Sequence, residues 1–337
     1  MDTAHRHGIA VILDVVYNHF GPSDLDHSLW QFDGWEQNNG GGIYFYEDWR
    51  AEIPWGSRPD YGRPEVRQYI CDNVVDWLGQ YRIDGLRFDM TAYIRSVDGS
   101  GADAQSIPGG LQLLRELNDV VDASQPWKFR IAEDMRNDVM ITAPTSAGGA
   151  GFSAQWDPDF VTCVRAAMVT TDDAQRSMSS VAAAIERRYG DRWLSRVVYT
   201  ESHDADANGG ERLPSEIDPA KPDSCYAKKR STLGAAVVFT SPGIPMLFQG
   251  QEFLEDLWFT DSRPVDWTNQ TTYAGILALY RDLIALRRDL FGNTRGLRGS
   301  GLGRSPRQRR GQGARLSPVG PGRAARRHDR VAQLRKP

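Results

Sequence analysis

The sequence lacks the features that organise several common classes of protein. It has three cysteines in 337 residues, Cys71, Cys163 and Cys225, and they form no C-x-x-C pair. This argues against a disulfide framework and a zinc site, and we expect small, reduced core residues. No run of about twenty apolar residues is present, and the opening MDTAHRHG has no apolar stretch after its charges. We therefore expect no membrane span and no secretory signal, and a cytoplasmic protein.

Aromatic residues are missing from residues 295–337, which also hold thirteen Lys or Arg against one acid, Asp329. The rest of the chain carries a net charge of -16. Clustered basic residues are what phosphate binding requires, so an acidic body makes nucleic acid an improbable partner and suits a neutral polyhydroxyl ligand.

The basic tail shows no helical or strand periodicity, and we expect it to be disordered. One interpretation is a nucleic-acid-binding arm. The interpretation we favour is a change of coding frame near Arg295, because a regular helical pattern gives way abruptly to an Arg, Gly and Pro composition there.

Residues 1–294 alternate between apolar β-type runs and helical patterns, which is typical of a parallel sheet with right-handed crossovers. Helical spacing is clearest over residues 64–81. The predicted strands cover residues 9–16, 85–89, 130–133, 152–156, 197–201 and 244–248.

Four of these runs end in carboxylates, histidine or arginine. They are VILDVVYNH (residues 11–19), GLRFD (85–89), RIAED (130–134) and VVYTESHD (197–204). In an α/β barrel, side chains at the carboxyl ends of the strands point into the mouth of the barrel, where such folds keep their chemistry. The pattern therefore indicates an enzyme.

In order, context and residue type, the four segments resemble the four signature regions of the α-amylase superfamily, glycoside hydrolase family 13, over Met1 to about Arg295. The resemblance implies a (β/α)8 TIM barrel. Because the first segment lies on the third strand of that barrel, strands 3 to 8 are present and strands 1 and 2 apparently missing. We expect a partial catalytic barrel over 1–294, with an aromatic-rich loop insertion at about 20–63, and a tail over 295–337. The open sheet predicts loss of activity for this chain.

The resemblance assigns the chemistry to three acids, Asp89, Glu133 and Asp204. Asp89 would be the nucleophile, Glu133 the general acid and base, and Asp204 the group that grips the sugar hydroxyls beside the reacting carbon. Retaining glycoside chemistry needs such a nucleophile and proton donor about 5 to 5.5 Å apart. Burial or nearby negative charge from Asp89 and Asp204 would help Glu133 to hold its proton. The adjacent Asp134 should point to the opposite face of the strand, because side chains alternate along it.

Further residues are expected to bind substrate or support the site. Arg87 lies two residues before Asp89 on the same side of the strand, where its charge would keep the nucleophile ionised. The resemblance adds His203, His19 and Asn18 as groups that hydrogen-bond sugar, and Tyr17 beside them. Asp14 is expected to bond Arg87 and the strand ends rather than substrate.

The insertion is rich in aromatic side chains, namely Trp30, Phe32, Trp35, Tyr44, Phe45, Tyr46, Trp49 and Trp55. Aromatic loops at the active face suit the apolar faces of sugar rings, although a small core inside the insertion is an equal alternative for any one Trp. Asn18 also corresponds to a calcium-associated position in several amylases. No cluster of oxygen ligands is evident, so we expect no metal and no other cofactor.

Which member of the family this is stays open between two types. IAED, ESHD and GIPMLFQGQEFLEDLWF followed by PVDW resemble the 1,4-α-glucan branching enzymes, whereas DVVYNHFGP and GFSAQWDPDF resemble maltooligosyl trehalohydrolases. We favour branching of an α-1,4-glucan such as glycogen, amylose or a maltooligosaccharide. An α-glucan hydrolase, or an inactive fragment that only binds glucan, is the alternative.

Overall fold

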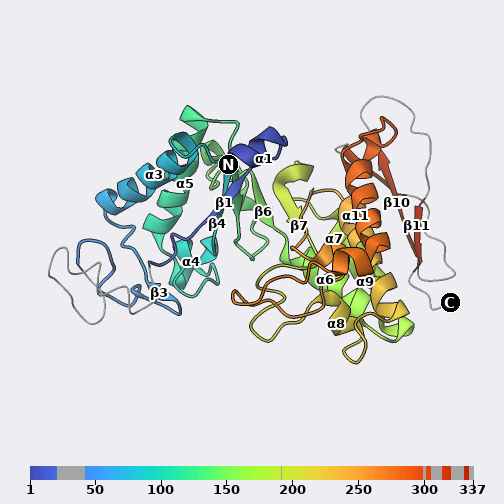
Figure 1. Cartoon of the computed structure of the whole chain (residues 1–337). Coiled ribbons are helices and arrows are strands. Elements are labelled where there is room, and N and C mark those ends of the chain that lie inside the picture. Colours follow the sequence, from blue (N-terminus) through green and yellow to red (C-terminus); the bar gives the residue numbers. More distant parts are fainter. Residues whose placement is uncertain (21–41, 191, 299–300, 305–312, 320–329, 334–337) are drawn as a thin grey trace. The chain divides into compact units, whose positions relative to one another are not determined.

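A computed structural model describes residues 1–20, 42–190, 192–298, 301–304, 313–319 and 330–333 (Figure 1). The chain forms two compact units, Met1–Trp156 and Asp157–Pro337. Each unit has a hydrophobic core of its own. The division falls within residues 1–294, and the expected boundary near residue 295 stays a prediction. The predicted aromatic residues Trp30, Phe32 and Trp35 lie outside the described residues.

The first unit contains the strands that carry three of the four motifs. In chain order its elements are α1 (Asp2–Arg6), β1 (Ile12–Val15), β2 (Glu52–Ile53), β3 (Gly56–Ser57), α3 (Pro64–Gly79), β4 (Gly85–Phe88), α4 (Thr91–Arg95), α5 (Pro108–Ser124), β5 (Phe129–Ala132) and β6 (Ala154–Trp156). The strands β1, β4, β5 and β6 pair side by side in that order, all parallel. The short β2 and β3 form an antiparallel hairpin.

Helices α3 and α5 pack against each other and against this sheet (Figure 1). Helix α3 begins with Pro64 at its first position, where the missing N–H costs nothing. Its apolar stripe includes Val66, Ile70 and Val74, which recur at helical spacing and are buried. The helix predicted over 64–81 is thus confirmed, and ends at Gly79.

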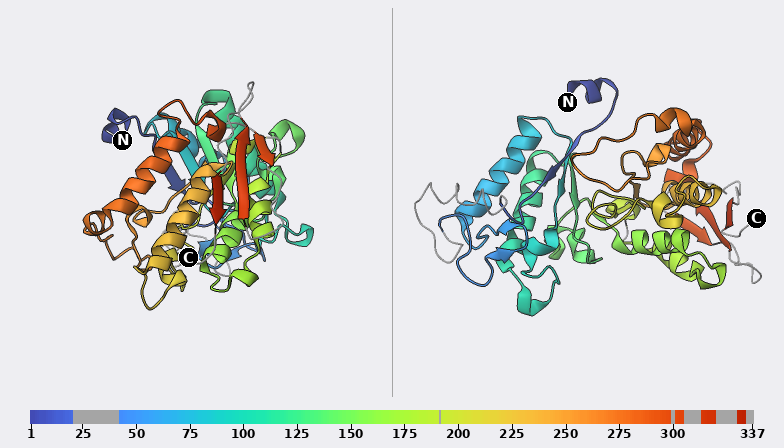
Figure 2. Two further views of the ribbon diagram at one scale, coloured as in Figure 1. Left: turned by 90° about the vertical axis from the view of Figure 1, so that its right-hand side faces the viewer. Right: turned by 60° about the horizontal axis from the view of Figure 1, so that its bottom comes forward.

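The second unit carries the fourth motif. Its elements are α6 (Pro158–Val169), α7 (Met178–Glu186), β7 (Arg196–Val198), α8 (Leu213–Ile217), α9 (Cys225–Thr240), β8 (Ile244–Pro245), α10 (Asn269–Thr272), α11 (Ala274–Arg287), β9 (Gly301–Arg304), β10 (Gly313–Val319) and β11 (Arg330–Gln333). Strands β7 and β8 pair in parallel, and α9 and α11 lie side by side (Figure 2).

All six predicted strands are confirmed, with bounds that differ from the expected ones by one to three residues at one end or both. Strand β7 ends at Val198, and the segment that holds Glu201 and Asp204 follows it. The cysteine prediction holds less well. Cys71 is buried, but Cys163 is half-buried and Cys225 is exposed at the start of α9.

The basic tail differs from the expected disorder. Strands β9, β10 and β11 form an antiparallel sheet in the order β11-β10-β9. Strands pair through their backbone N–H and C=O groups, which every non-proline residue has. Strands can therefore form where the sequence shows no alternation of apolar residues, and a search for that alternation does not find them. The frame change near Arg295 stays a prediction.

Candidate active site

Asp89 and Glu133 stand at the same level of neighbouring strands. Strands β4 and β5 pair with Phe88 opposite Ala132, the last residue of each strand. The two acids directly follow these residues. The Glu133 N–H donates to the Phe88 carbonyl at 3.0 Å, which extends the ladder by one step. The sheet therefore aligns the two acids before any side-chain contact is made.

The other end of this pair of strands depends on a glycine. Gly85 opposes Phe129, and a Cβ on Gly85 would lie 2.7 Å from the Phe129 Cβ and 2.8 Å from its carbonyl oxygen. A larger residue would push β4 away from β5. The close approach keeps the two acids on adjacent strands.

Arg87 connects the acids. Its Nη1 donates to Asp89 Oδ1 at 2.8 Å, and its Nη2 lies 2.7 Å from Glu133 Oε2. The same Nη1 reaches Asp14 at 2.7 Å and 2.9 Å, so the predicted Asp14–Arg87 bond is confirmed. Burial works to lower the pKa of Arg87, but the carboxylates of Glu133, Asp14 and Asp89 outweigh it and raise the pKa.

Trp156, at the end of β6, covers this arginine. Its ring centroid lies 4.7 Å from the Arg87 guanidinium carbon, within cation–π range. Trp156 lies in GFSAQWDPDF, a segment that resembles maltooligosyl trehalohydrolases, but no pattern in the sequence predicted its packing on Arg87. Its position at the end of the strand after β5 is the signal that could have found it.

Asn18 faces Asp89. It is fully buried and donates from Nδ2 to Asp89 Oδ2 at 2.7 Å and to the Asp89 carbonyl at 3.0 Å. Its Oδ1 bonds His19 Nδ1. The structure therefore shows Asn18 bound to Asp89, and its contact with sugar stays a prediction. His19, half-buried, is next in this chain of contacts.

Backbone geometry after β4 serves Glu133. Met90 has φ 36°, a left-handed conformation rare for L residues, and its N–H donates to Glu133 Oε2 at 2.9 Å. The neighbouring Asp134 points the other way: Thr91 Oγ1 lies 3.1 Å from it and Arg95 holds it with bonds of 2.7 Å and 2.9 Å. The predicted separation of Glu133 from Asp134 is confirmed.

Tyr17 requires a correction. Its side chain is buried in the core, and its hydroxyl donates to Asn73 Oδ1 on α3 at 2.8 Å. Burial raises the pKa of this phenol well above its ordinary value. Tyr17 thus packs the first unit and presents its hydroxyl to a helix instead of a substrate. The strand ends at Val15, so alternation along it could not predict where Tyr17 points.

The remaining predicted residues belong to the second unit. His203 and Asp204 follow β7, and His203 Nε2 lies 3.3 Å from Asp204 Oδ2. Their side chains are 40% and 54% exposed. The structure thus groups Asp14, Asn18, His19, Arg87, Asp89 and Glu133 in one unit, and His203 with Asp204 in the other.

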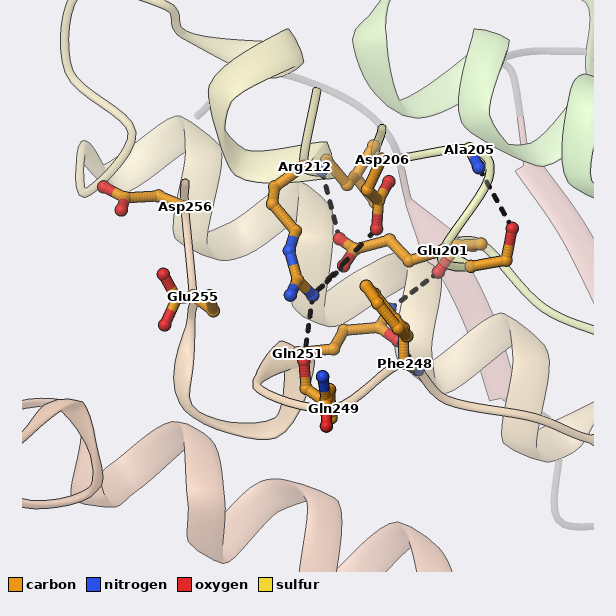
Figure 3. Close-up of polar contacts among 12 residues, drawn as sticks. Glu201, Ala205, Asp206, Arg212, Phe248, Gln249, Gln251, Glu255 and Asp256 are labelled. Carbon is orange, nitrogen blue, oxygen red and sulfur yellow. Dashed lines mark hydrogen bonds and ion pairs between the residues drawn. The ribbon is translucent and has the colours of Figure 1, made fainter. Parts of the chain in front are cut away.

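The same segment of the chain contributes to a buried cluster that the sequence analysis did not predict. Glu201, Asp206 and Arg212 point toward one another, with Arg212 Nη1 3.3 Å from Glu201 Oε2 and 4.0 Å from Asp206 Oδ2 (Figure 3). Arg165 pairs with Asp206 at 2.9 Å. Burial raises the pKa of Glu201, and burial together with the Glu201 carboxylate raises the pKa of Asp206 to about 8.

This cluster ties the loop after β7 to the loop after β8. Arg212 donates to the Gln249 carbonyl at 3.0 Å and stacks over the Phe248 ring at 4.3 Å (Figure 3). Gln251 in turn donates to Thr200 Oγ1 at 2.8 Å. The cluster is sealed from solvent, so its place is structural support for the segment that bears His203 and Asp204.

Within the described residues, no group of three or more His, Cys, Asp or Glu side chains is arranged to hold a metal ion. In the same part of the chain no helix has the length and apolar character needed to cross a membrane.

Comparison with known proteins decides the family. The model of the α-amylase catalytic domain matches residues 22–274, three quarters of the chain. The chain belongs to the α-amylase family. The matched region contains Asp89, Glu133 and Asp204. The part of the chain just before it contains Asp14, Asn18 and His19.

The curated relatives include 1,4-alpha-glucan branching enzymes GlgB. That of Nitrosococcus oceani is 33% identical over 296 residues, covering 84% of this chain and 38% of the relative. That of Mycobacterium sp. (strain JLS) is 32% identical over 297 residues, covering 84% and 37%. The chain thus spans under two fifths of the length of these relatives.

Solved structures show the fold. The cyclic alpha-maltosyl-(1-->6)-maltose hydrolase of Arthrobacter globiformis, in complex with maltose, aligns with TM-score 0.68 at 17% identity, over 94% of this chain and 67% of its own. A pullulanase from Anoxybacillus sp. LM18-11, complexed with maltotriose, aligns at 0.67 and 21%, over 94% and 46%. The fold is the (β/α)8 barrel of this family, and the described residues carry six of its strands.

Proposed function

We propose that this chain is the catalytic part of a retaining α-glucan-active enzyme, and that its reaction is branching, the transfer of α-1,4-linked segments to 6-hydroxyl groups. The observation that carries the proposal is the alignment of Asp89 and Glu133 on β4 and β5, joined by Arg87. Arg87 holds one oxygen of each acid, at 2.8 Å for Asp89 and 2.7 Å for Glu133, so both carboxylates lie beside one guanidinium. Two carboxylates on one guanidinium suit the 5 to 5.5 Å of retaining enzymes better than the roughly 6.5 to 9.5 Å that inversion requires.

In the first half-reaction, an Asp89 oxygen forms a bond to the anomeric carbon while the bond from that carbon to the glycosidic oxygen breaks. Glu133 gives its proton to the departing oxygen. In the second half-reaction, Glu133 takes the proton of an acceptor 6-hydroxyl, and the acceptor oxygen replaces Asp89 on the carbon. With water as acceptor, the same steps give hydrolysis.

The contacts of the two acids suit these different tasks. Arg87 and Asn18 each hold one oxygen of Asp89, so the nucleophile is held in one orientation. Glu133 is almost fully buried, and its contacts with Arg87 and Met90 both use Oε2. Neither contact uses Oε1, and this is the oxygen from which Glu133 would pass its proton to the glycosidic oxygen.

The proposal gives substrate contacts to residues at the ends of β1 and β7. His19 and His203 would donate hydrogen bonds to the reacting sugar, and Asp204 would accept from its hydroxyls. Bonds of this kind favour the distorted, oxocarbenium-like sugar when they strengthen in the transition state. The preference for branching over hydrolysis is supported by the curated relatives, which are branching enzymes by name.

Incubation with amylose tests the proposal. Branching by this chain should change iodine staining without a proportional release of reducing ends, whereas hydrolysis releases them together with the loss of stain. The Asp89→Asn variant, measured in parallel, should abolish either change. The loss of activity expected from the open sheet is the other outcome: a chain that binds maltoheptaose in calorimetry but leaves amylose unchanged would be a glucan-binding fragment, and the proposed reaction would be wrong for it.

A further inference from the structure

Arg87 serves three carboxylates with one guanidinium group. Its Nη1 is shared between Asp14 and Asp89, and its Nη2 lies 2.7 Å from Glu133 Oε2. A planar guanidinium binds most firmly when it forms two parallel bonds with a single carboxylate. The bridging arrangement is therefore one that Arg87 could leave by pairing with one acid alone.

Asp14 is the acid that competes with this bridge. Nη1 of Arg87 already reaches both of its oxygens, at 2.7 Å and 2.9 Å. The side chain of Asp14 is 52% exposed, whereas that of Glu133 is 4% exposed. A turn of the guanidinium toward Asp14 would complete a two-bond pair nearer to water and draw Nη2 away from Glu133. The bridge therefore needs a restraint on its buried side.

Trp156 lies where it can supply that restraint. Its ring centroid is 4.7 Å from the Arg87 guanidinium carbon. Among the described residues no acceptor takes the buried Arg87 Nε–H, so polar contacts hold the group through its Nη atoms. The indole is itself buried at the end of β6, where Ala154 and Gln155 pair with β5. A ring fixed by the sheet thus contacts the guanidinium that the acids hold only at its Nη atoms.

We propose that Trp156 is a positioning residue, which keeps the Arg87 guanidinium between Asp89 and Glu133. The inference rests on the proposed retaining reaction and adds to it a residue that acts through Arg87 and not on the sugar. An indole is the strongest cation–π partner among the side chains, and a buried ring also keeps water from the ion pairs beside it. Loss of the ring should therefore slow the bond-breaking step and leave KM for glucan nearly unchanged.

Two substitutions of similar size separate the aromatic contact from the loss of bulk. Trp156→Leu removes the aromatic face, and Trp156→Phe keeps one. With amylose as substrate, kcat should fall by roughly 10-fold or more in Trp156→Leu, with KM within about twofold. Trp156→Phe should bring kcat back to within about threefold of the parent chain. Trp156→Met takes the place of Trp156→Leu if that variant does not fold.

Trp193→Leu is the matched control. Trp193 is buried in the second unit and lies over Arg188, with 3.7 Å between its ring centroid and the guanidinium carbon. The substitution removes the same kind of contact from an arginine outside the proposed site. Both Leu variants should lower the melting temperature, but only Trp156→Leu should lower kcat. Equal losses of kcat in the two variants, or an unchanged kcat in Trp156→Leu, would overturn the inference.

Labelling of Arg87 with phenylglyoxal gives a readout that needs no turnover. The reagent adds to accessible guanidinium groups, and Arg87 is buried in the parent chain. Mass spectrometry after digestion should show faster labelling of Arg87 in Trp156→Leu than in the parent or in Trp156→Phe. Equal labelling rates in all three would overturn the inference. If labelling rises in Trp156→Leu but the parent leaves amylose unchanged, the restraint on Arg87 stands and the proposed reaction fails.

Discussion

The two units each contain a cluster of arginine and carboxylates, and the clusters differ in access to solvent. In the first, the side chains of Asp14 and Asp89 around Arg87 are 52% and 21% exposed. In the second, Glu201 and Asp206 around Arg212 are at most 1% exposed. The pKa of Asp206 rises to about 8 in the sealed cluster, while the chemistry we propose belongs to the open one. A perturbed pKa can therefore mark structural support as well as a site.

The largest expected difference comes from removing one acid from each cluster. Asp89→Asn should lower turnover of amylose by roughly 10⁴-fold or more, because the covalent step has lost its nucleophile. Asp206→Asn should retain turnover within about threefold at pH 7, because the amide replaces a carboxyl that is already protonated there. Comparable losses in both variants would show that the sealed cluster takes part in the reaction.

Breaking the sealed cluster should act on stability instead. Arg212→Leu leaves Glu201 buried without its ion-pair partner, and we expect the free energy of unfolding to fall by about 3 to 5 kcal/mol in urea titrations. Arg281→Leu, an exposed position on α11, is the control and should change it by less than about 0.5 kcal/mol. A similar small change in both variants would contradict the structural place given to Arg212.

Within the open cluster, Asn18 offers a finer test. Asn18→Ala removes the bonds to the Asp89 carboxylate and carbonyl but leaves the bond from Arg87, so kcat should fall by roughly 10- to 100-fold with little change in KM. Asn73→Ala, which removes the partner of Tyr17, should cost stability and leave kcat unchanged. A rise in KM alone for Asn18→Ala would return Asn18 to the sugar-binding place expected from the resemblance.

The last expected difference is a pH dependence of stability that arises in the sealed cluster. The folded chain keeps the Asp206 proton up to about pH 8, whereas the unfolded chain loses it near its ordinary pKa of 3.8. Stability should therefore fall as pH rises through that interval, by at most about 1.4 kcal/mol per pH unit from this group. Between pH 5 and 8 the melting temperature should fall more steeply with rising pH for the wild type than for Asp206→Asn. Parallel curves would mean that Asp206 is ionised in the folded chain.

Much of the fold and part of the site were predictable from local pattern. Strand β4 and the Arg87–Asp89 pair follow from an apolar run and its alternation, and the helix over 64–79 follows from its apolar stripe. Family resemblance added Glu133 and Asp204. The unpredicted features are tertiary: the left-handed Met90, the packing of Trp156 on Arg87 and the burial of Tyr17 depend on segments far apart in sequence.

Trapping the glycosyl-enzyme tests the central claim most directly. The fluoride ion of α-maltosyl fluoride needs no acid in order to depart. Glu133→Gln should therefore form the covalent intermediate but lack the base that activates the acceptor to resolve it. Mass spectrometry of the tryptic peptide Phe88–Arg95 should then show an added maltosyl group on Asp89. An adduct on another acid, or complete turnover with inversion at the anomeric carbon, would contradict the proposed pairing of Asp89 with Glu133.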